Sequence, residues 1–295
     1  MSNEDDEPKP LLMTVVGAGG IGSCLLDLLA PALSNGALAA SLGGVRIRVM
    51  DGDVVEACNI AHQRFTTPDI GRQKAEVLAA RHASLAVVAV EVVACGENLR
   101  RSEQIAGEDI VVVAVDRPEP RRLVHSQFDG TWLDLRCRGD AMLNLDNSCD
   151  AADLDRMTPT HEPLSCQLSG AIESGNIEFG FALAAVHGAQ WCIQHLRARA
   201  GADTRPPAAG ALSITHGVLQ TFIQDAPATS PAAPLTRPAR ASKHWTSEEE
   251  MRLLAEAEHG MQLEQVVASH GRSAGAIFRR LCRLALPIRD RGDAS

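Results

Sequence analysis

VVGAGGIGS, residues 15–23, is the stretch that decides the fold class. Its four glycines are Gly17, Gly19, Gly20 and Gly22. A short apolar run precedes them, and a mostly apolar, helix-compatible run follows at 24–29. Such a strand, turn and helix start brings backbone N–H groups against a phosphate. The stretch predicts a nucleotide site and leaves open whether the phosphate belongs to a dinucleotide or to ATP.

Length and composition bound the class of protein. The chain has 295 residues, 45% of them hydrophobic, with a mean hydropathy of -0.05, as in an ordinary globular protein with room for one α/β domain and a smaller unit. No apolar run approaches the length of a membrane-spanning helix. The N-terminal MSNEDDEPKP has no signal-peptide pattern, so we expect a cytoplasmic protein with reduced thiols. The eight cysteines of the chain never form C-x-x-C, so no zinc site is expected.

Strand and helix patterns alternate after the first ten residues. The apolar runs 11–16, 45–50 and 110–115 are short and bounded by Gly or Asp, which predicts buried parallel strands. Helical patterns lie between and after them, as at 73–82 and 177–196. This alternation predicts an α/β fold with a doubly wound, mostly parallel Rossmann-like sheet and a ligand at the carboxyl ends of its strands.

Composition also suggests where domains begin and end. ATSPAAPLTRPAR at 228–240 is typical of a semi-rigid linker. We expect five segments: a disordered acidic N-terminus (1–10), a nucleotide-binding domain (11–200), an Ala- and Pro-rich linker (201–242), a small all-α three-helix module (243–287) and a tail (288–295).

Three later motifs bear on the choice of nucleotide. They are DGDVVEACNIAHQRF (51–65), DIGRQKA (69–75) and VVVAVDRPEPR (111–121), and they have no role in a hydride-transfer site. With the glycine loop they resemble the ThiF/MoeB-type family, the adenylation domains that activate ubiquitin and its bacterial sulfur-carrier relatives. The resemblance covers roughly residues 11–200. It is strongest to shorter bacterial ThiF-like proteins with an insertion before the second strand.

The resemblance implies a set of ATP-binding residues. Asp51 would hold the ribose, Lys74 would contact the phosphates and Asp116 would bind Mg²⁺. Asn59 and Gln63 would order the loop on the phosphate side. Asp53 and Arg121 complete the set, which together with the four glycines implies ATP and Mg²⁺ as ligands. Taken alone, Lys74 is also compatible with a solvated lysine at a helix start, and Asp116 with a cap at a strand end.

The sequence departs from the family at the phosphate clamp. The family arginine falls on His62, and a histidine is mostly neutral at pH 7. Arg64 stands two residues later as a substitute, so His62, Arg64 and Lys74 are the catalytic candidates around the phosphates. Two alternatives to an active adenylyltransferase stay open: a nucleotide-binding pseudoenzyme that is associated with DNA, and, more remotely, an NAD-dependent oxidoreductase.

Cys166 lies in TPTHEPLSCQLSG (158–170), where similar proteins often carry a cysteine. In thioester-forming relatives such a thiol takes the acyl group from the adenylate. The alternative is an inert, half-buried cysteine. The resemblance implies a small ubiquitin-like protein as substrate and a homodimer as the assembly.

The segment from Lys243 to Leu284 has a signature of its own. Thr246 or Ser247 can cap a first helix, and the pattern resembles the small Myb/SANT-like helix-turn-helix units. In such a unit the third helix enters the major groove of DNA, and four arginines are the candidate contacts: Arg272, Arg279, Arg280 and Arg283. A helical docking module with solvated arginines is the alternative, and the net charge of -9 argues against extensive nucleic-acid binding.

Overall fold

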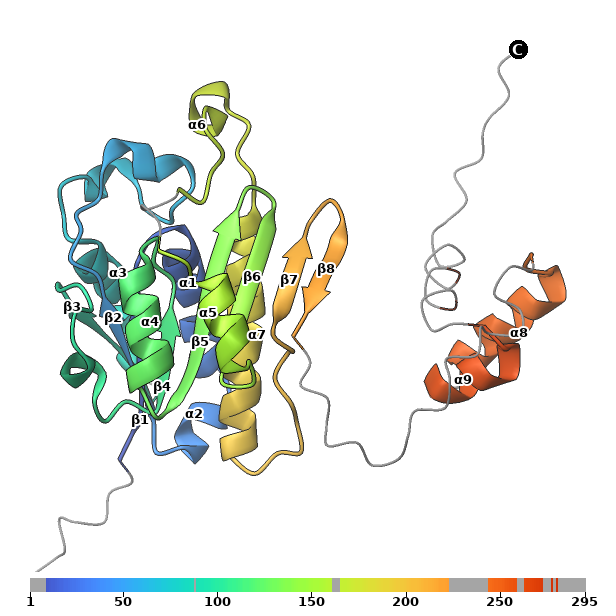
Figure 1. Cartoon of the computed structure of the whole chain (residues 1–295). Coiled ribbons are helices and arrows are strands. Elements are labelled where there is room, and N and C mark those ends of the chain that lie inside the picture. Colours follow the sequence, from blue (N-terminus) through green and yellow to red (C-terminus); the bar gives the residue numbers. More distant parts are fainter. Residues whose placement is uncertain are drawn as a thin grey trace, which may run out of the picture. The chain divides into compact units, whose positions relative to one another are not determined.

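The computed structural model describes residues 9–87, 89–160, 165–222, 244–258 and 263–272, with residues 277 and 280. The chain divides into two units, Met1–Asp225 and Ala226–Ser295, and each is described by itself (Figure 1). The larger unit is an α/β fold, and helices make up the described part of the smaller one. Among the described residues no helix is long and apolar enough to cross a membrane.

An eight-stranded sheet forms the centre of the larger unit as far as it is described, in the order β3-β2-β1-β4-β5-β6-β7-β8. Its strands are β1 (Leu11–Val16), β2 (Val45–Met50), β3 (Val90–Cys95), β4 (Ile110–Val113), β5 (Thr131–Arg138), β6 (Ala141–Asp146), β7 (Gly210–Ser213) and β8 (Gly217–Thr221). The neighbours in β3-β2-β1-β4-β5 pair in parallel. The neighbours in β5-β6-β7-β8 pair antiparallel. The doubly wound, mostly parallel sheet predicted from the sequence is confirmed.

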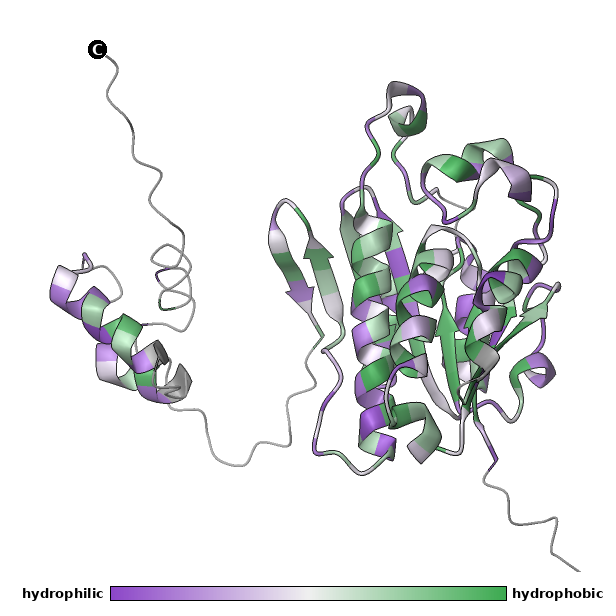
Figure 2. Cartoon of the chain, turned by 180° about the vertical axis from the view of Figure 1, so that it is seen from behind, coloured by the Kyte–Doolittle hydropathy of each residue, from purple (hydrophilic) through white to green (hydrophobic). Residues whose placement is uncertain are grey.

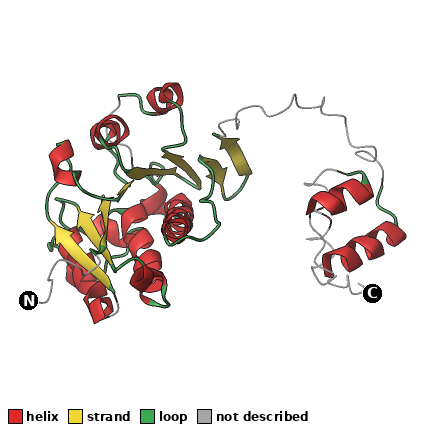
Figure 3. Ribbon diagram, turned by 90° about the horizontal axis from the view of Figure 1, so that it is seen from below, coloured by secondary structure: helices red, strands yellow, loops and turns green. Residues whose placement is uncertain are grey.

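Helices cover both faces of this sheet (Figure 3). They are α1 (Gly20–Ser34), α2 (Leu38–Ser41), α3 (Lys74–His82), α4 (Pro118–Gln127), α5 (Ala151–Met157), α6 (Ala171–Ser174) and α7 (Gly180–Arg199). Short 3-10 turns are η1 (Ala57–Ala61), η2 (Thr67–Asp69), η3 (Ala83–Val87) and η4 (Ser102–Ile105). Side chains of α1, α3 and α7 share one core cluster, and those of α4, α5 and η4 join the other.

The central strand β4 shows why its sequence is a continuous apolar run. Ile110 and Val112 pack into the cluster under α1 and α7, whereas Val111 and Val113 pack into the cluster under α4. Successive side chains of a strand point to opposite faces, so a strand covered on both sides is apolar at every position. Figure 2 shows the central strands mainly in the hydrophobic colour.

The sheet extends beyond the parallel strands predicted from the sequence. Residues 210–221, which the sequence analysis assigned to the linker, form the hairpin β7–β8 and pair with β6. These strands are four and five residues long and β8 is exposed throughout, so they lack the apolar pattern of a buried strand.

The smaller unit contains α8 (Ser247–Glu258) and α9 (Leu263–His270). Leu253, Val266 and Ile277 form its buried core. Thr246 caps α8, since its side-chain oxygen accepts the N–H of Glu249 at 3.2 Å. Of the predicted third helix only Ile277 and Arg280 lie within the described residues.

Candidate functional site

The glycine loop joins β1 to α1 and has no room for side chains at two of its positions. Gly17 has φ +99°, and a Cβ there would lie 2.5 Å from the carbonyl oxygen of Ala114. A Cβ at Gly22 would lie 1.9 Å from the carbonyl oxygen of Gly17. Glycine at these two positions is therefore required for the tight turn.

The same loop is open at its tip. Gly19 is the N-cap of α1 and offers no side-chain cap, and a Cβ there would meet nothing within 4 Å. The first N–H groups of a helix have no intrahelical partner, so at this end they remain for an external acceptor. Together with the helix dipole they make a site suited to an anion.

Asp51 fixes the loop from the end of β2. Its carboxylate accepts the N–H of Ala18 at 2.6 Å and the N–H of Asp53 at 2.8 Å. Burial raises the pKa of Asp51, although these two hydrogen bonds and the nearby Lys74 oppose the shift. The residue predicted to hold a ribose therefore also holds the backbone of the glycine loop.

Lys74 is the first residue of α3 and is buried, with a side chain 9% exposed. Its Nζ lies 3.6 Å from a carboxylate oxygen of Asp53, whose own side chain is 66% exposed. Its backbone N–H also donates to the carbonyl of Asp53 at 3.0 Å. The structure thus pairs these two predicted residues, with the amino group at the carboxyl end of β2.

Asp116 lies just beyond the carboxyl end of β4, the strand that neighbours β1. It is exposed and makes no hydrogen bond with any described residue. The loop and this strand end are in direct contact, because Ala114 packs against Gly17. Asp116 is therefore a carboxylate near the glycine loop that accepts no hydrogen bond from a described residue.

Arg121, predicted in the nucleotide-binding set, is buried on α4. Its guanidinium pairs with Asp134 on β5 and donates to the carbonyl of Val115. Both contacts are internal, so Arg121 supports the strand ends, and its part in nucleotide binding stays a prediction.

The carboxylate of Asp134 has two further partners, which the sequence analysis missed. His125 lies 3.0 Å and Arg136 2.6 Å from its fully buried carboxylate. Burial, with Arg136 and Arg121 nearby, lowers the pKa of His125 to about 4, and burial lowers that of Arg136 to about 10. These partners come from α4 and β5, and no local sequence signal links them.

The turn η1 and the residues after it carry the predicted phosphate-side loop. Asn59 is buried and accepts the N–H of Glu56 at 2.9 Å, and its carbonyl accepts the N–H of Gln63 at 2.8 Å. Asn59 thus holds this turn by hydrogen bonds, and its part on the phosphate side stays a prediction. Two buried atoms of the turn, Nδ1 of His62 and Oε1 of Gln63, have no hydrogen-bond partner.

The side chain of Arg64 contacts helix α1. Its Nε lies 3.1 Å from Asp27 in the middle of α1, and its backbone N–H donates to Ser23 at 3.1 Å. Asp27 also pairs with Arg81 and His82. The guanidinium offered as a substitute for the family arginine is thus engaged by a carboxylate on the side of the helix.

Cys166 lies beside His62 and a second cysteine, Cys137 of β5. The neighbouring Cys137, then His62 and Gln167, lower the pKa of Cys166, against the effect of its burial. The contact with Cys166, with burial, raises the pKa of Cys137. The sequence singled out Cys166 and His62 separately, but their meeting and the part of Cys137 depend on the fold.

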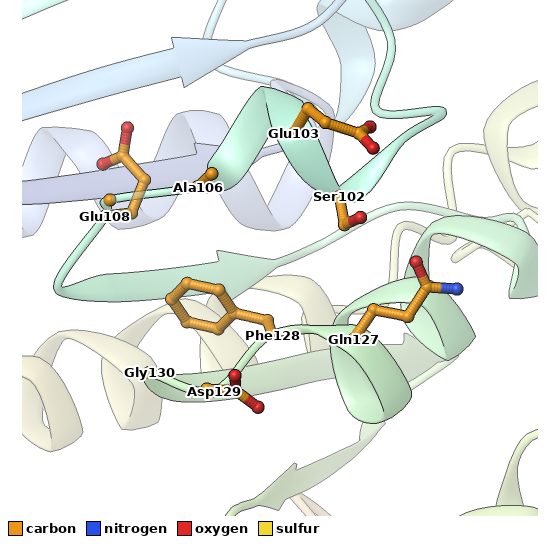
Figure 4. Close-up of a pocket in the computed structure, with 9 residues that line it drawn as sticks. Ser102, Glu103, Ala106, Glu108, Gln127, Phe128, Asp129 and Gly130 are labelled. Atoms are coloured by element: carbon orange, nitrogen blue, oxygen red, sulfur yellow. The ribbon is translucent and has the colours of Figure 1, made fainter.

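A cavity of about 430 Å³ lies elsewhere (Figure 4). Its lining includes Glu108, just before β4, and Gly130, just before β5. It is therefore at the amino ends of the strands, whereas ligands of doubly wound sheets bind at the carboxyl ends. Glu103, Glu108 and Asp129 make it acidic, which is unsuited to a polyphosphate.

Comparison with protein families agrees with this geometry. The model of the ThiF family matches residues 11–196, which span the glycine loop, Lys74, Asp116 and Cys166. The chain belongs to the ThiF family. We call residues 11–196 the ThiF domain. No curated protein matches the chain.

Solved structures of E. coli MccB share the fold of the ThiF domain. MccB with ATP has a TM-score of 0.50 at 15% identity, over 75% of this chain and 66% of that chain. MccB with AMPCPP and selenomethionine MccA has a TM-score of 0.51 at 16% identity, over 76% of this chain and 67% of that chain. The chain spans about two thirds of the length of these proteins, and at such identities the likeness concerns the fold.

The described residues contain no cluster of three or more His, Cys, Asp or Glu side chains that could hold a metal ion. This finding does not test the magnesium prediction. Mg²⁺ retains several waters and is held by one or two carboxylates plus phosphates. Asp116, an exposed carboxylate near the glycine loop, fits that requirement.

The two candidate DNA-contact arginines that the structure describes form ion pairs within the smaller unit. Arg272 is 3% exposed, pairs with Glu249 at 2.6 Å and lies 4.0 Å over the ring of Trp245. Arg280 pairs with Glu250. The guanidinium of Arg272 is thus buried against a carboxylate of its own unit, and its contact with DNA stays a prediction. Arg279 and Arg283 lie outside the described residues.

Proposed function

We propose that the chain is an ATP-dependent adenylyltransferase that activates the C-terminal carboxylate of a small ubiquitin-like or sulfur-carrier protein. The observation that carries the proposal is the open, uncapped start of α1 behind a glycine loop that has no room for side chains. Membership of the ThiF family supports it. The MccB structures that contain ATP or AMPCPP lead us to place a nucleoside triphosphate there.

The proposed reaction begins with a carboxylate oxygen attacking the α-phosphorus of ATP. The new P–O bond forms as the bond to the β-phosphate breaks, which gives an acyl-adenylate and pyrophosphate. Negative charge builds on the phosphates as this happens, so fixed N–H groups and a cation stabilise the transition state. The amides at 19–22 and the amino group of Lys74 have that chemistry.

The other residues receive supporting roles in this proposal. Asp51 orients the ribose while it fixes the loop, and Asn59 and Gln63 shape the phosphate side. Asp116 would hold Mg²⁺, which would supply positive charge to the phosphates when bound. The sulfur of Cys166 would then attack the carbonyl carbon: a C–S bond forms, the C–O bond to phosphate breaks, AMP leaves with the electron pair, and the thiol proton goes to solvent.

The domain organisation belongs to the same proposal. The adenylation domain would extend over residues 11–200, and the helical module at 243–287 would dock a partner. The internal pairing of Arg272 with Glu249 favours a protein over DNA for this module, because a buried guanidinium does not reach phosphates.

Two measurements test the proposal. Titration of the full chain with ATP and with NAD should show binding of ATP only. Exchange of radiolabelled pyrophosphate into ATP should then require a small β-grasp protein ending in Gly-Gly.

The matched control is the same protein with its C-terminus amidated, which removes the nucleophilic oxygen and should abolish exchange. Binding of NAD in place of ATP, or exchange that persists with the amide, would overturn the proposal.

A further inference from the structure

Two arginines hold the carboxyl end of helix α5. The helix ends at Met157, and the next residue, Thr158, is 2% exposed. The side chain of Arg136 donates to the carbonyl of Met157 and, at 2.7 Å, to the hydroxyl of Thr158. Arg122 donates to the carbonyl of Thr158 at 2.7 and 3.2 Å and to the hydroxyl of Thr160 at 2.9 Å. We call these contacts the arginine clamp.

The clamp is the main polar attachment of α5 to the rest of the domain. No residue of the helix is buried, and Leu154 and Met157 are only partly buried against the core. The last carbonyls of a helix have no intrahelical partner, and cations are favoured beside them. A guanidinium can serve two such acceptors at once, because its N–H groups form a planar fork. Arg122 lies on α4 and Arg136 on β5, so the clamp joins α5 to both elements (Figure 1).

The backbone at Cys166 is attached to the end of the same strand. The N–H of Gly139, in the turn after β5, donates to the carbonyl of Cys166 at 2.9 Å. Arg136 and Gly139 are three positions apart, which is at most about 11 Å of chain. Thr158 and Cys166 are therefore both held at the carboxyl end of β5, one by the clamp and the other by the turn.

Arg136 also connects the clamp to the strand end near the glycine loop. Its guanidinium bonds the carboxylate of Asp134 at 2.6 and 3.1 Å. Asp134 pairs with Arg121, which donates to the carbonyl of Val115, the residue before Asp116. Strands β4 and β5 are parallel, so this chain of contacts lies at the carboxyl ends of the strands, where a doubly wound sheet binds its ligand.

We propose that Arg122 and Arg136 are positioning residues for acyl transfer. By fixing Thr158 they keep the segment that leads to Cys166 at the end of β5, beside the strand end that carries Asp116. Neither arginine contacts the glycine loop, so the first half-reaction does not depend on the clamp. The inference deepens the proposed function and rests on it for the transfer step.

The transfer step explains why such positioning matters. The sulfur of Cys166 attacks the carbonyl carbon of the acyl-adenylate, a C–S bond forms, and the C–O bond to phosphate breaks. AMP leaves with the electron pair, and the thiol proton goes to solvent. The reacting atoms must approach to about 3–3.5 Å, so a segment that is free to move lowers the rate of this step.

Hydrogen–deuterium exchange of the full-length protein tests the clamp without ATP or a protein substrate. Arg122→Gln removes the fork on α4 and leaves the partners of Asp134 in place. The amides of 151–160 should exchange about tenfold faster, whereas those of β6 should be unchanged. Arg156→Gln is the matched control, because Arg156 is 60% exposed on α5 and pairs with Asp153, and it should change exchange less than about twofold. Unchanged exchange of 151–160 in Arg122→Gln would overturn the inference.

The two half-reactions separate positioning from a general effect on stability. With a small β-grasp protein ending in Gly-Gly, pyrophosphate exchange reports adenylation, and a thiol-sensitive adduct at Cys166 reports transfer in a single turnover. Arg122→Gln should slow transfer about tenfold and leave pyrophosphate exchange unchanged. Arg122→Lys has one ammonium in place of the fork and should recover part of the rate. Thr160→Val removes one acceptor of the clamp and should slow transfer less.

The outcomes distinguish this inference from the proposed function. Equal loss of both half-reactions in Arg122→Gln would indicate a general structural role and overturn the inference. Pyrophosphate exchange without an adduct at Cys166 in the unaltered protein would also overturn it and leave the adenylation proposal standing. Failure of the unaltered protein to exchange pyrophosphate would overturn the adenylation proposal, and the hydrogen exchange of 151–160 would then decide whether the clamp holds the segment.

Discussion

Two groups of polar side chains in the ThiF domain are built in opposite ways. Around Asp134, one carboxylate is surrounded by Arg121, His125 and Arg136, and every charge has a partner inside the fold. Around the glycine loop, by contrast, helix amides are uncapped, Asp116 has no hydrogen bond among the described residues, and His62 and Gln63 each leave a buried atom unpaired. The closed group stabilises the strand ends, and the open group is available to a ligand.

The largest expected effect tests the closed group. Asp134→Asn removes the negative charge that faces three basic side chains and leaves buried Arg121 without a counter-charge, so we expect a loss of about 3–5 kcal/mol in the free energy of unfolding. Urea denaturation followed by circular dichroism measures it. Asp153→Asn, at an exposed pair with Arg156, is the matched control and should cost less than about 0.5 kcal/mol. Equal losses in the two variants would show that the cluster contributes no stability.

Two glycines test the open group next. Gly22→Ala places a methyl group 1.9 Å from the carbonyl oxygen of Gly17, so the loop must shift, and we expect about 3 kcal/mol of destabilisation and loss of ATP binding. Gly19→Ala places its methyl group in open space. This variant should melt like the original protein but bind ATP about tenfold more weakly, because the methyl group would occupy phosphate space. Unchanged ATP binding in Gly19→Ala, measured by calorimetry, would place the phosphates elsewhere.

The closed group also predicts a pH dependence. The pKa of His125 is about 4 in the folded chain, below its ordinary value of 6.5. At pH values between these two pKa values the unfolded chain therefore binds more protons than the folded chain. Folding stability should therefore fall by about 2 kcal/mol as the pH is lowered from 6.5 towards 4. Urea midpoints measured from pH 7 to 4.5 should drop less steeply in His125→Gln. Parallel slopes in the two proteins would contradict the assignment.

The sequence predicted the parts of the molecule that local patterns encode. The strands at 11–16 and 45–50, the glycine turn and the helix beginning near Lys74 were all foreseen, because each follows from apolar periodicity or from the steric needs of glycine. The hairpin β7–β8 was not foreseen, since its short exposed strands have no apolar alternation.

The sequence named candidate site residues but gave no sign of their partners in the fold. Arg121, Arg64 and Arg272 were all read as available charges, yet each pairs with a carboxylate from another element. A basic residue looks the same in sequence whether it faces a ligand or a buried aspartate. Cys137 was overlooked for the same reason, because only the fold brings it to Cys166.

The smallest expected effect comes from one cation of the open group, the amino group of Lys74. Lys74→Met keeps the buried aliphatic stem and removes the amino group, whose only recorded ion-pair partner among the described residues, Asp53, is 66% exposed. An ion pair with so exposed a partner adds little to stability, so the melting temperature should barely change. If the amino group serves the phosphates, ATP should bind about tenfold more weakly, or roughly 1.4 kcal/mol, while adenosine should bind as before. Arg72→Met, two residues away at an exposed guanidinium, is the control for general loss of positive charge. Equal weakening in both variants would mean that Lys74 acts only through the overall field, whereas a loss confined to Lys74 and to phosphate-bearing ligands would place its charge in the open group.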